Sequence, residues 1–162
     1  MIEHDYFGAL DELGHEAWSE LIEANEQQVN VSVRIVGAPE EDALDRAAAM
    51  VMSLEAMDWH ARELLVAELA SGASIPAQFA ARAIAEIDED DFLEAINRES
   101  GDRVMDLLRS LRLESLVLTP NRAGSEEAFA VLRYVFAPDV FEPTLAVTLD
   151  DAAELVSVDI ED

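Results

Sequence analysis

Apolar and polar residues alternate between positions 29 and 35 of this chain. Such a period of two predicts a β-strand with one buried face. A less regular partner strand is expected around Glu16 to Ile22, with the turn near Asn25 and Glu26. We therefore expect a β-hairpin near the N-terminus. The alternating residues are Val29, Val31, Val33 and Ile35, separated by Asn30, Ser32 and Arg34.

The apolar period then changes to three and four residues, which predicts a run of helices. Pro39 suits the first position of a helix, and the acids at positions 40–42 favour the positive end of the helix dipole. Asp58 is expected to cap a second helix, which Gly72 would end. A third helix is expected from Pro76 to Ile87. The apolar positions of the first two helices are Leu44, Ala47, Ala48, Val51 and Leu54, followed by Ala61, Leu64, Leu65 and Leu69.

An acidic segment, "EIDEDDFLEA", occupies residues 86–95. A calcium-binding EF-hand loop that starts at Asp88 would need an oxygen ligand at its fifth position and a glycine at its sixth. The chain has phenylalanine and leucine there, so that loop geometry does not form. Asp91 and Glu94 instead resemble a capping box, with Asp in place of Ser or Thr. We interpret the segment as the start of a helix and keep a weak cation site as the alternative.

After Gly101 a further helix is expected from Asp102 to Leu111, and then the period returns to two. The second strand of this part, from Ala128 to Phe136, is apolar on both faces except at Arg133, which predicts a central place in a sheet. Short connections between the strands favour an antiparallel meander. Four strands are predicted, in "RLESLVLTP", "EAFAVLRYVFAP", "PTLAVTLDD" and "ELVSVDIED".

Hairpin, helices and meander together predict an α+β fold. The expected order is an N-terminal β-hairpin, a central run of four to five helices and a C-terminal four-stranded antiparallel meander. The length of 162 residues suits one domain, residues 1–162. Tryptophans, tyrosines and phenylalanines are expected in the core, as are Met50, Met52 and Met57 on one helical segment.

The chain carries 36 acidic and 10 basic residues, for a formal net charge of −26, and every base is an arginine. An excess of one charge opposes compaction by self-repulsion, which high salt screens. We interpret the acids, which are distributed along the whole chain, as the surface of a protein from a salt-adapted or GC-rich organism. An acidic face for a basic protein partner is the alternative. Nucleic-acid binding is not expected, because phosphates require a Lys/Arg footprint.

Cysteine is absent, which excludes disulfides, thiol catalysis and cysteine-bound zinc. The acidic N-terminal segment lacks the apolar core of a signal peptide. No run of residues approaches the roughly 18 apolar residues of a membrane span. We therefore expect a cytoplasmic protein with no membrane association.

Several segments resemble one bacterial family of uncharacterised proteins. They are "DYFGALD", "VNVSVRI", "LEAMDWHAREL" and the C-terminal "FAVLRYVFAPDVFEPTLAVTLDDAAELVSVDIED". The family they resemble is the domain of unknown function numbered two thousand and four. The chain departs from that pattern at Arg133, where an acid is expected, over residues 73–100, and at its end, which lacks a serine. The resemblance implies the same α+β order and brings no activity, cofactor or catalytic residue.

Two side-chain arrangements are candidates for chemistry. His60 and Glu63 lie three residues apart on a predicted helix, and zinc would use them only if His4 or His15 supplied a third ligand. A surface histidine with a helical neighbour is the commoner arrangement. Ser71 lacks a nearby base, and the chain has no nucleophile elbow and no glycine-rich phosphate loop.

Arginines are concentrated near the acidic segment, since five of the ten fall between Arg82 and Arg112. Local ion pairing with the nearby carboxylates is the expected arrangement. A patch of arginines that faces a partner is the functional alternative.

The leading functional hypothesis is a small non-enzymatic protein that binds another protein as an inhibitor or an immunity protein does. Its acidic surface would steer it to a basic target. The alternative is a small enzyme or small-molecule binder with a carboxylate-lined pocket. A homodimer formed through the sheet is compatible with both. We assign no catalytic, cofactor-binding or metal-binding residue from the sequence.

Overall fold

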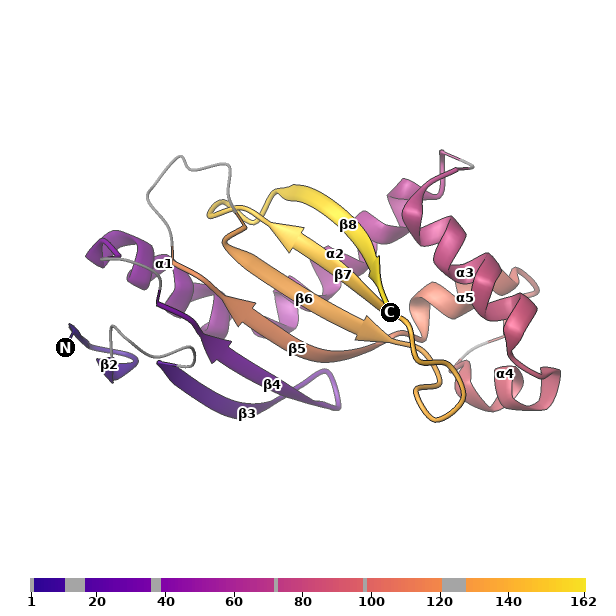
Figure 1. Cartoon of the computed structure of the whole chain (residues 1–162), viewed down its shortest axis with the longest axis horizontal. Helices are drawn as coiled ribbons and strands as arrows, with labels where there is room; N and C mark the ends of the chain where they lie inside the picture. Colours follow the sequence, from indigo (N-terminus) through magenta and orange to yellow (C-terminus); the bar gives the residue numbers. More distant parts are fainter. Residues whose placement is uncertain (1, 11–16, 36–38, 72, 98, 121–127) are drawn as a thin grey trace.

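The computed structural model of the chain describes residues 2–10, 17–35, 39–71, 73–97, 99–120 and 128–162 (Figure 1). Strands come first along the chain, then a run of helices, then strands again. In order they are β1 (Ile2–His4), β2 (Gly8–Leu10), β3 (Trp18–Ala24), β4 (Gln27–Val33), α1 (Glu41–Met52), α2 (Leu54–Glu68), α3 (Ile75–Glu86), α4 (Glu89–Ala95), α5 (Arg103–Arg109), β5 (Arg112–Leu118), β6 (Ala130–Val135), β7 (Thr144–Leu149) and β8 (Leu155–Glu161).

The principal sheet has six strands in the order β3-β4-β5-β6-β7-β8. Neighbouring strands are antiparallel except β4 and β5, which are parallel. The predicted hairpin is β3–β4 and the predicted meander is β5–β8, so both are confirmed, as is the central place of β6. The sequence did not indicate that hairpin and meander share one sheet. A parallel contact needs a crossover connection, and the helical run from α1 to α5 provides it.

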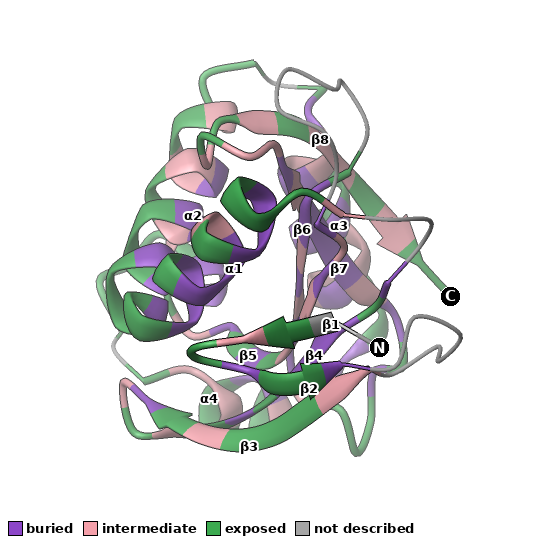
Figure 2. Cartoon of the chain, turned by 90° about the vertical axis from the view of Figure 1, so that its left-hand side faces the viewer, coloured by how far each residue is buried: buried purple, intermediate pink, exposed green. Residues whose placement is uncertain are grey.

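Helices α1 and α2 cover one face of this sheet (Figures 1 and 2). Side chains on a strand alternate between the two faces, so every second residue points to these helices. Val31, Leu116, Leu132 and Val147 form one such row across β4 to β7, and each is 0% exposed. The helical period predicted for α1 is also confirmed. Its predicted apolar residues Leu44, Ala47, Ala48 and Val51 are all buried.

Aromatic side chains join the later helices to the chain that follows β6. Phe79 of α3 lies against Phe141 with 5.5 Å between ring centroids, and Phe92 of α4 lies against Phe136 at 5.6 Å. All four rings are buried. These contacts extend the core beyond the part of the sheet that α1 and α2 cover.

A small second sheet pairs β1 with β2, and the sequence did not predict it. Phe7, in the turn between its strands, is buried and lies 5.1 Å from the ring of Trp18 at the start of β3. This edge-on aromatic contact holds the small sheet beside the larger one.

Helix starts differ from the predictions. Helix α1 begins at Glu41, so Pro39 precedes the helix and does not open it. Helix α2 begins at Leu54. The residue before it, Ser53, is both the C-cap of α1 and the N-cap of α2. Asp58 therefore lies inside α2, and the predicted cap at Asp58 is wrong.

Helix α3 agrees with its predicted range, and the hydroxyl of its N-cap Ser74 accepts a hydrogen bond from the Ala77 backbone N–H at 3.4 Å. Helix α2 ends at Glu68, and the predicted stop at Gly72 lies outside the described residues. No helix in the described part of the chain is long and apolar enough to cross a membrane.

Candidate functional site

The turn between β3 and β4 places two amide side chains beside helix α2. Ala24 pairs with Gln27, so the turn consists of Asn25 and Glu26, as predicted. Their φ angles of 50° and 65° are those of a type I′ hairpin, whose twist matches the flanking strands. The Asn25 amide donates to the Glu55 backbone oxygen at 3.2 Å and thereby fastens the turn to α2.

Asp58 is a buried carboxylate, only 1% exposed, in the second turn of α2. Each of its oxygens accepts two hydrogen bonds. Oδ2 accepts from Asn25 at 3.0 Å and from Gln27 at 3.1 Å, and Oδ1 accepts from Arg62 at 2.9 Å and from the Tyr134 hydroxyl at 2.8 Å. A buried carboxylate needs such partners, since an unpaired charge in the interior is strongly destabilising.

Gln27 connects the hairpin to β5 at a place where the backbone ladder does not reach. The parallel pairing of β4 and β5 begins only at Asn30 and Ser115. The Gln27 Oε1 atom accepts from the Leu113 backbone N–H at 2.7 Å and from Arg62 at 2.9 Å. The side chain therefore supplies the acceptor that β4 would otherwise provide to Leu113.

Arg62 spans three parts of the fold with one guanidinium group. It pairs with Asp58 one helical turn earlier, donates to Gln27, and donates to the backbone oxygen of Leu111. Its guanidinium carbon also lies 5.2 Å from the centroid of the Tyr134 ring, within the range of a cation–π contact. A planar fork with several donors suits this position better than a lysine would.

Tyr134 closes the arrangement from β6, where it is 0% exposed. Burial raises the pKa of Tyr134 well above its ordinary value, and the charge of Asp58 and the hydrogen bond to it raise the pKa further, while Arg62 lowers it. The phenol therefore stays protonated at neutral pH and keeps donating to Asp58.

These five residues form one polar cluster, which we call the Asp58 cluster: Asn25, Gln27, Asp58, Arg62 and Tyr134. Every buried side-chain nitrogen and oxygen among the described residues has a hydrogen-bond partner. A carboxylate has about four acceptor positions, and those of Asp58 are all occupied. The cluster therefore ties the hairpin, α2, β5 and β6 together and leaves Asp58 no free position from which to take a proton from a substrate.

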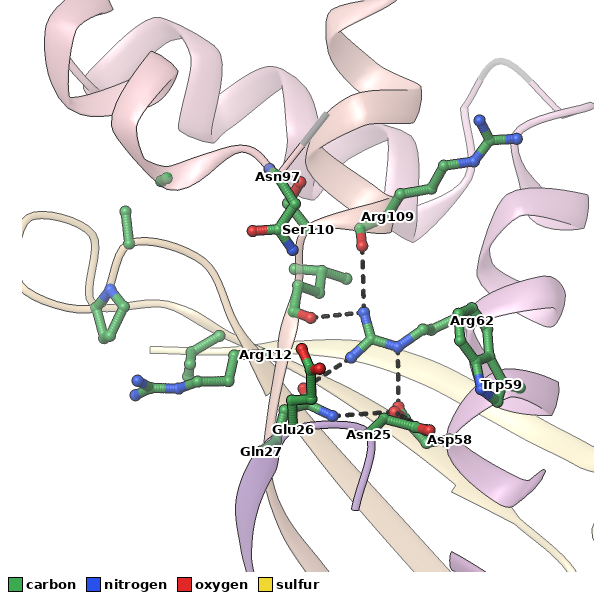
Figure 3. Close-up of a pocket in the computed structure, with 15 residues that line it drawn as sticks. Asn25, Glu26, Gln27, Asp58, Trp59, Arg62, Asn97, Arg109, Ser110 and Arg112 are labelled. Carbon is green, nitrogen blue, oxygen red and sulfur yellow. Dashed lines mark hydrogen bonds and ion pairs between the residues drawn. The ribbon is translucent and has the colours of Figure 1, made fainter. Parts of the chain in front are cut away.

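A hollow of about 710 Å³ opens beside this cluster (Figure 3). Arg62 lies in the middle of the hollow, with Arg112 on one side and Trp59 on the other. The Trp59 side chain is 60% exposed, so the prediction that the tryptophans lie in the core is wrong for this residue. The other residues that line the hollow are Asn25, Glu26, Gln27, Asp58, Ala95, Asn97, Arg109, Ser110, Leu111, Val135, Ala137 and Pro138.

A second hollow of about 570 Å³ also includes Trp59 in its lining. It lies at the break between α1 and α2, beside the end of β3, and Met52 on its wall is 67% exposed. Met50 and Met57 are buried as predicted, whereas the prediction was wrong for Met52. Two large apolar side chains are thus exposed next to two hollows. We call the area of Met52, Trp59, Arg109 and Arg112 the Trp59 surface.

The predicted ion pairing of the arginines holds for part of the group. Arg82 pairs with Glu86, and Arg103 pairs with Glu89. Arg98 lies outside the described residues. Within the described chain, however, Arg109 and Arg112 form no ion pair, and both line the larger hollow.

The charges in the lining of the larger hollow differ from those of the carboxylate-lined pocket that is expected of a small-molecule binder. Its carboxylates are Glu26 and Asp58, and Asp58 is paired with Arg62. Arg109 and Arg112 add two further positive charges. A carboxylate-lined pocket is therefore not found at this hollow, where arginines outnumber acids in a protein of net charge −26.

The acidic segment begins a helix, as predicted, but with a different cap. Helix α4 starts at Glu89, and its N-cap is Asp88, which makes no side-chain capping bond. Asp91 lies inside the first turn, so the capping box predicted for Asp91 and Glu94 is wrong. The described residues contain no group of three or more His, Asp or Glu that could hold a metal ion.

The histidines are used singly. The His60 ring lies 3.1 Å from the backbone oxygen of Ala153, and His4 lies 2.7 Å from the carboxylate of Asp45 on α1. His4 is therefore brought over α1 and not to the His60–Glu63 pair on α2. His15 lies outside the described residues.

Comparison with protein-family models, with curated proteins and with solved structures found no match to this chain. The resemblance to the family numbered two thousand and four therefore stays a prediction.

Proposed function

We propose that the chain is a non-enzymatic binding protein whose partner is another protein and whose contact area is the Trp59 surface. The observation that carries this proposal is the exposure of Trp59, 60%, and of Met52, 67%, beside two hollows. Large exposed apolar side chains that lie together are characteristic of interaction sites. Tryptophan and arginine are also the residue types most enriched among the contacts that dominate protein binding.

The chemistry of the Asp58 cluster supports binding over catalysis. A general base must have a position free to receive a proton from the substrate. Asp58 has none, because four donors occupy its oxygens. A cluster of this kind fixes the position of Arg62 and stiffens the part of α2 that carries Trp59. A stiff surface loses less entropy when a partner binds.

The charge of the chain indicates which partners it favours. A net charge of −26 attracts basic proteins over long distances and repels acidic ones. Arg109 and Arg112 then add two local positive charges that suit carboxylates on the same partner. We therefore propose a target of net positive charge, bound in the manner of an inhibitor or immunity protein.

The test is an affinity pull-down of the tagged chain from its own cell lysate at native salt, with mass spectrometry of the retained proteins. Trp59→Ala removes the central contact, and Leu93→Ala is the matched control, since Leu93 is an exposed apolar residue, 41% exposed, on α4. We expect one stoichiometric basic protein with the wild type and with the control. Removal of a central tryptophan costs about 2 kcal/mol or more, so the Trp59 variant should retain little of it.

Retention that is equal for the wild type and Trp59→Ala would contradict the proposed contact area, and an empty column would contradict a protein partner. The second candidate is then a small-molecule binder. It is favoured by the volume of the larger hollow and by two arginines without ion pairs there. It predicts that anionic metabolites raise the melting temperature of the wild type and do so less for Arg112→Ala.

A further inference from the structure

The face of the six-stranded sheet opposite α1 and α2 carries an unusual set of side chains. We call it the outer face. The register of the strands aligns its residues in rows across the sheet. One row is Ser19, Ser32, Val117, Val131, Thr148 and Ser157, and the next is Leu21, Asn30, Ser115, Arg133, Ala146 and Asp159.

No helix or strand of the described residues lies over this face (Figures 1 and 2). Ser, Thr, Ala and Val predominate in these two rows, which have no long side chain in the middle except Arg133. Small and β-branched residues of this kind allow two sheets to pack face to face at about 10 Å.

Charge is distributed unevenly over the outer face. The chain carries 36 acids, yet the only carboxylate in these two rows is Asp159, on the edge strand β8. The next row of the same face adds Glu23 and Glu161, which lie on the edge strands β3 and β8. The only cation in these two rows is Arg133, near the middle, and it pairs with Glu161 of β8 at 2.7 Å. Two chains of net charge −26 repel each other, and a contact free of carboxylates at its centre minimises that repulsion.

We propose that a second copy of this chain packs on the outer face, sheet against sheet. A two-fold axis brings the same residues together from both sides. A cation on β6 and carboxylates on β8 are complementary in such a pair, because Arg133 of each copy can then lie near Asp159 and Glu161 of the other. A basic partner would instead favour acids at the centre of the face, and the acids in these rows lie on the edge strands.

The size of the face sets the expected strength of the dimer. Six strands about 4.8 Å apart and about 20 Å long give roughly 500 Å² of projected area per copy. A standard interface buries about 800 Å² per partner, so we expect a reversible, concentration-dependent dimer. Salt should favour it, because the Debye length falls from about 10 Å at 0.1 M to about 3 Å at 1 M and screens the repulsion.

The test is sedimentation equilibrium of the full chain over a range of concentrations, in low and in molar KCl. We expect the apparent mass to rise from the monomer value of 17.8 kDa toward twice that value, and at lower concentration in molar salt. Val131→Glu places a carboxylate in the centre of the face and should weaken the dimer at least tenfold. Val140→Glu adds the same charge at an exposed residue in the turn after β6 and should leave the dimer unchanged.

A second variant keeps the test decisive if Val131→Glu fails to fold. Arg133→Glu changes a partly exposed side chain and should also abolish the dimer, whereas Arg133→Glu combined with Glu161→Arg should restore it. A wild type that stays monomeric in both salts overturns the proposal and leaves the face to a different protein. A dimer that survives both Val131→Glu and Arg133→Glu overturns it too. Trp59→Ala should leave the dimer intact, so the failure of the proposed protein partner and the failure of this dimer are distinguishable.

Discussion

The Asp58 cluster and the acidic segment at α4 are two opposite uses of the carboxylate group. The segment holds several acids in succession, and Glu89, Asp90 and Glu94 are all exposed to solvent. The acidic residue nearest to Asp58 in the sequence is Glu55, and Asp58 itself is 1% exposed. The dense group makes two ion pairs, from Glu86 to Arg82 and from Glu89 to Arg103, and all of these side chains are at least partly exposed. The isolated carboxylate accepts four hydrogen bonds in the interior.

This difference shows that the environment of a carboxylate determines its effect, and that the local density of acids does not. An exposed ion pair contributes about 0–1 kcal/mol, because water and salt screen it. A buried carboxylate with a full set of donors cannot lose one partner without leaving an unpaired polar group in the interior. The density of acids in the sequence therefore indicated the region whose carboxylates are expected to contribute less to stability.

The largest effect should come from removing the buried carboxylate. Asp58→Ala leaves Arg62, Tyr134 and the two amides without their common acceptor, and we expect a loss of about 3–5 kcal/mol in the free energy of unfolding. Glu94→Ala, at an exposed position of the acidic segment, should change it by no more than about 0.5 kcal/mol. Urea denaturation of both variants measures the contrast. Equal losses in the free energy of unfolding would contradict the view that the buried carboxylate stabilises the fold more than the exposed ones.

Salt should act on the exposed carboxylates and not on Asp58. We expect molar KCl to raise the melting temperature of the wild type by several degrees, because screening relieves the repulsion within a chain of net charge −26. Asp58→Ala should melt lower but gain as much from salt. Differential scanning calorimetry in low and molar KCl measures both increments. An unchanged wild-type melting temperature would refute the interpretation as salt adaptation.

A smaller effect should follow from removing only the hydroxyl of Tyr134. Tyr134→Phe deletes one of the four donors to Asp58, and we expect a loss of about 1–2 kcal/mol at neutral pH.

The same residue makes the stability depend on alkaline pH. The pKa of Tyr134 is raised in the folded chain, so its contribution is present in full below the unfolded pKa of about 10 and is lost as the pH rises from there toward the folded value. The chain has no lysine, no cysteine and only two tyrosines, so few other groups titrate there. Urea denaturation between neutral and alkaline pH should show this decline in the wild type and not in Tyr134→Phe. A decline of equal size in both would assign it to another group.

The smallest effect concerns Asp106 of α5, a second buried carboxylate with local partners. The Ser100 hydroxyl donates to Asp106 at 2.6 Å and the Ser100 backbone N–H at 2.8 Å, and these bonds hold the pKa of Asp106 below its usual value. The resulting contribution to stability is present above the unfolded pKa of about 4 and is lost as the pH falls through the folded value. Ser100→Ala should raise the Asp106 pKa, as measured by carboxyl NMR titration. An unaltered pKa would show that the backbone bonds suffice.

The sequence predicted local structure well wherever one period dominated. Alternation identified β4 and β5 to β8, and the three-four spacing identified α1 and α3, because each pattern follows from the geometry of the backbone alone. Helix caps were less certain. Asp58 and Asp91 both have the residue type of a cap, yet the helix had already begun before each of them.

The candidate site could be predicted only in one part. Asp58 and Arg62 lie four residues apart on a helix, a spacing that indicates an ion pair. Nothing local indicated that Gln27 and Tyr134 would join them, since these residues come from strands far away in the chain. The exposure of Trp59 also depends on which side of α2 meets the sheet, and composition predicts the reverse.

The sequence by itself determined the α+β order, the strand and helix periods, the absence of cysteine chemistry and the strong negative charge. These properties depend on residue type and on short-range spacing. The tertiary structure alone decided that β4 pairs with β5, that Asp58 is buried with four donors, and that the acids in the two central rows of the outer face are confined to the edge strand β8. Each of these depends on contacts between residues distant in sequence, whose positions follow only from the packing of the whole chain.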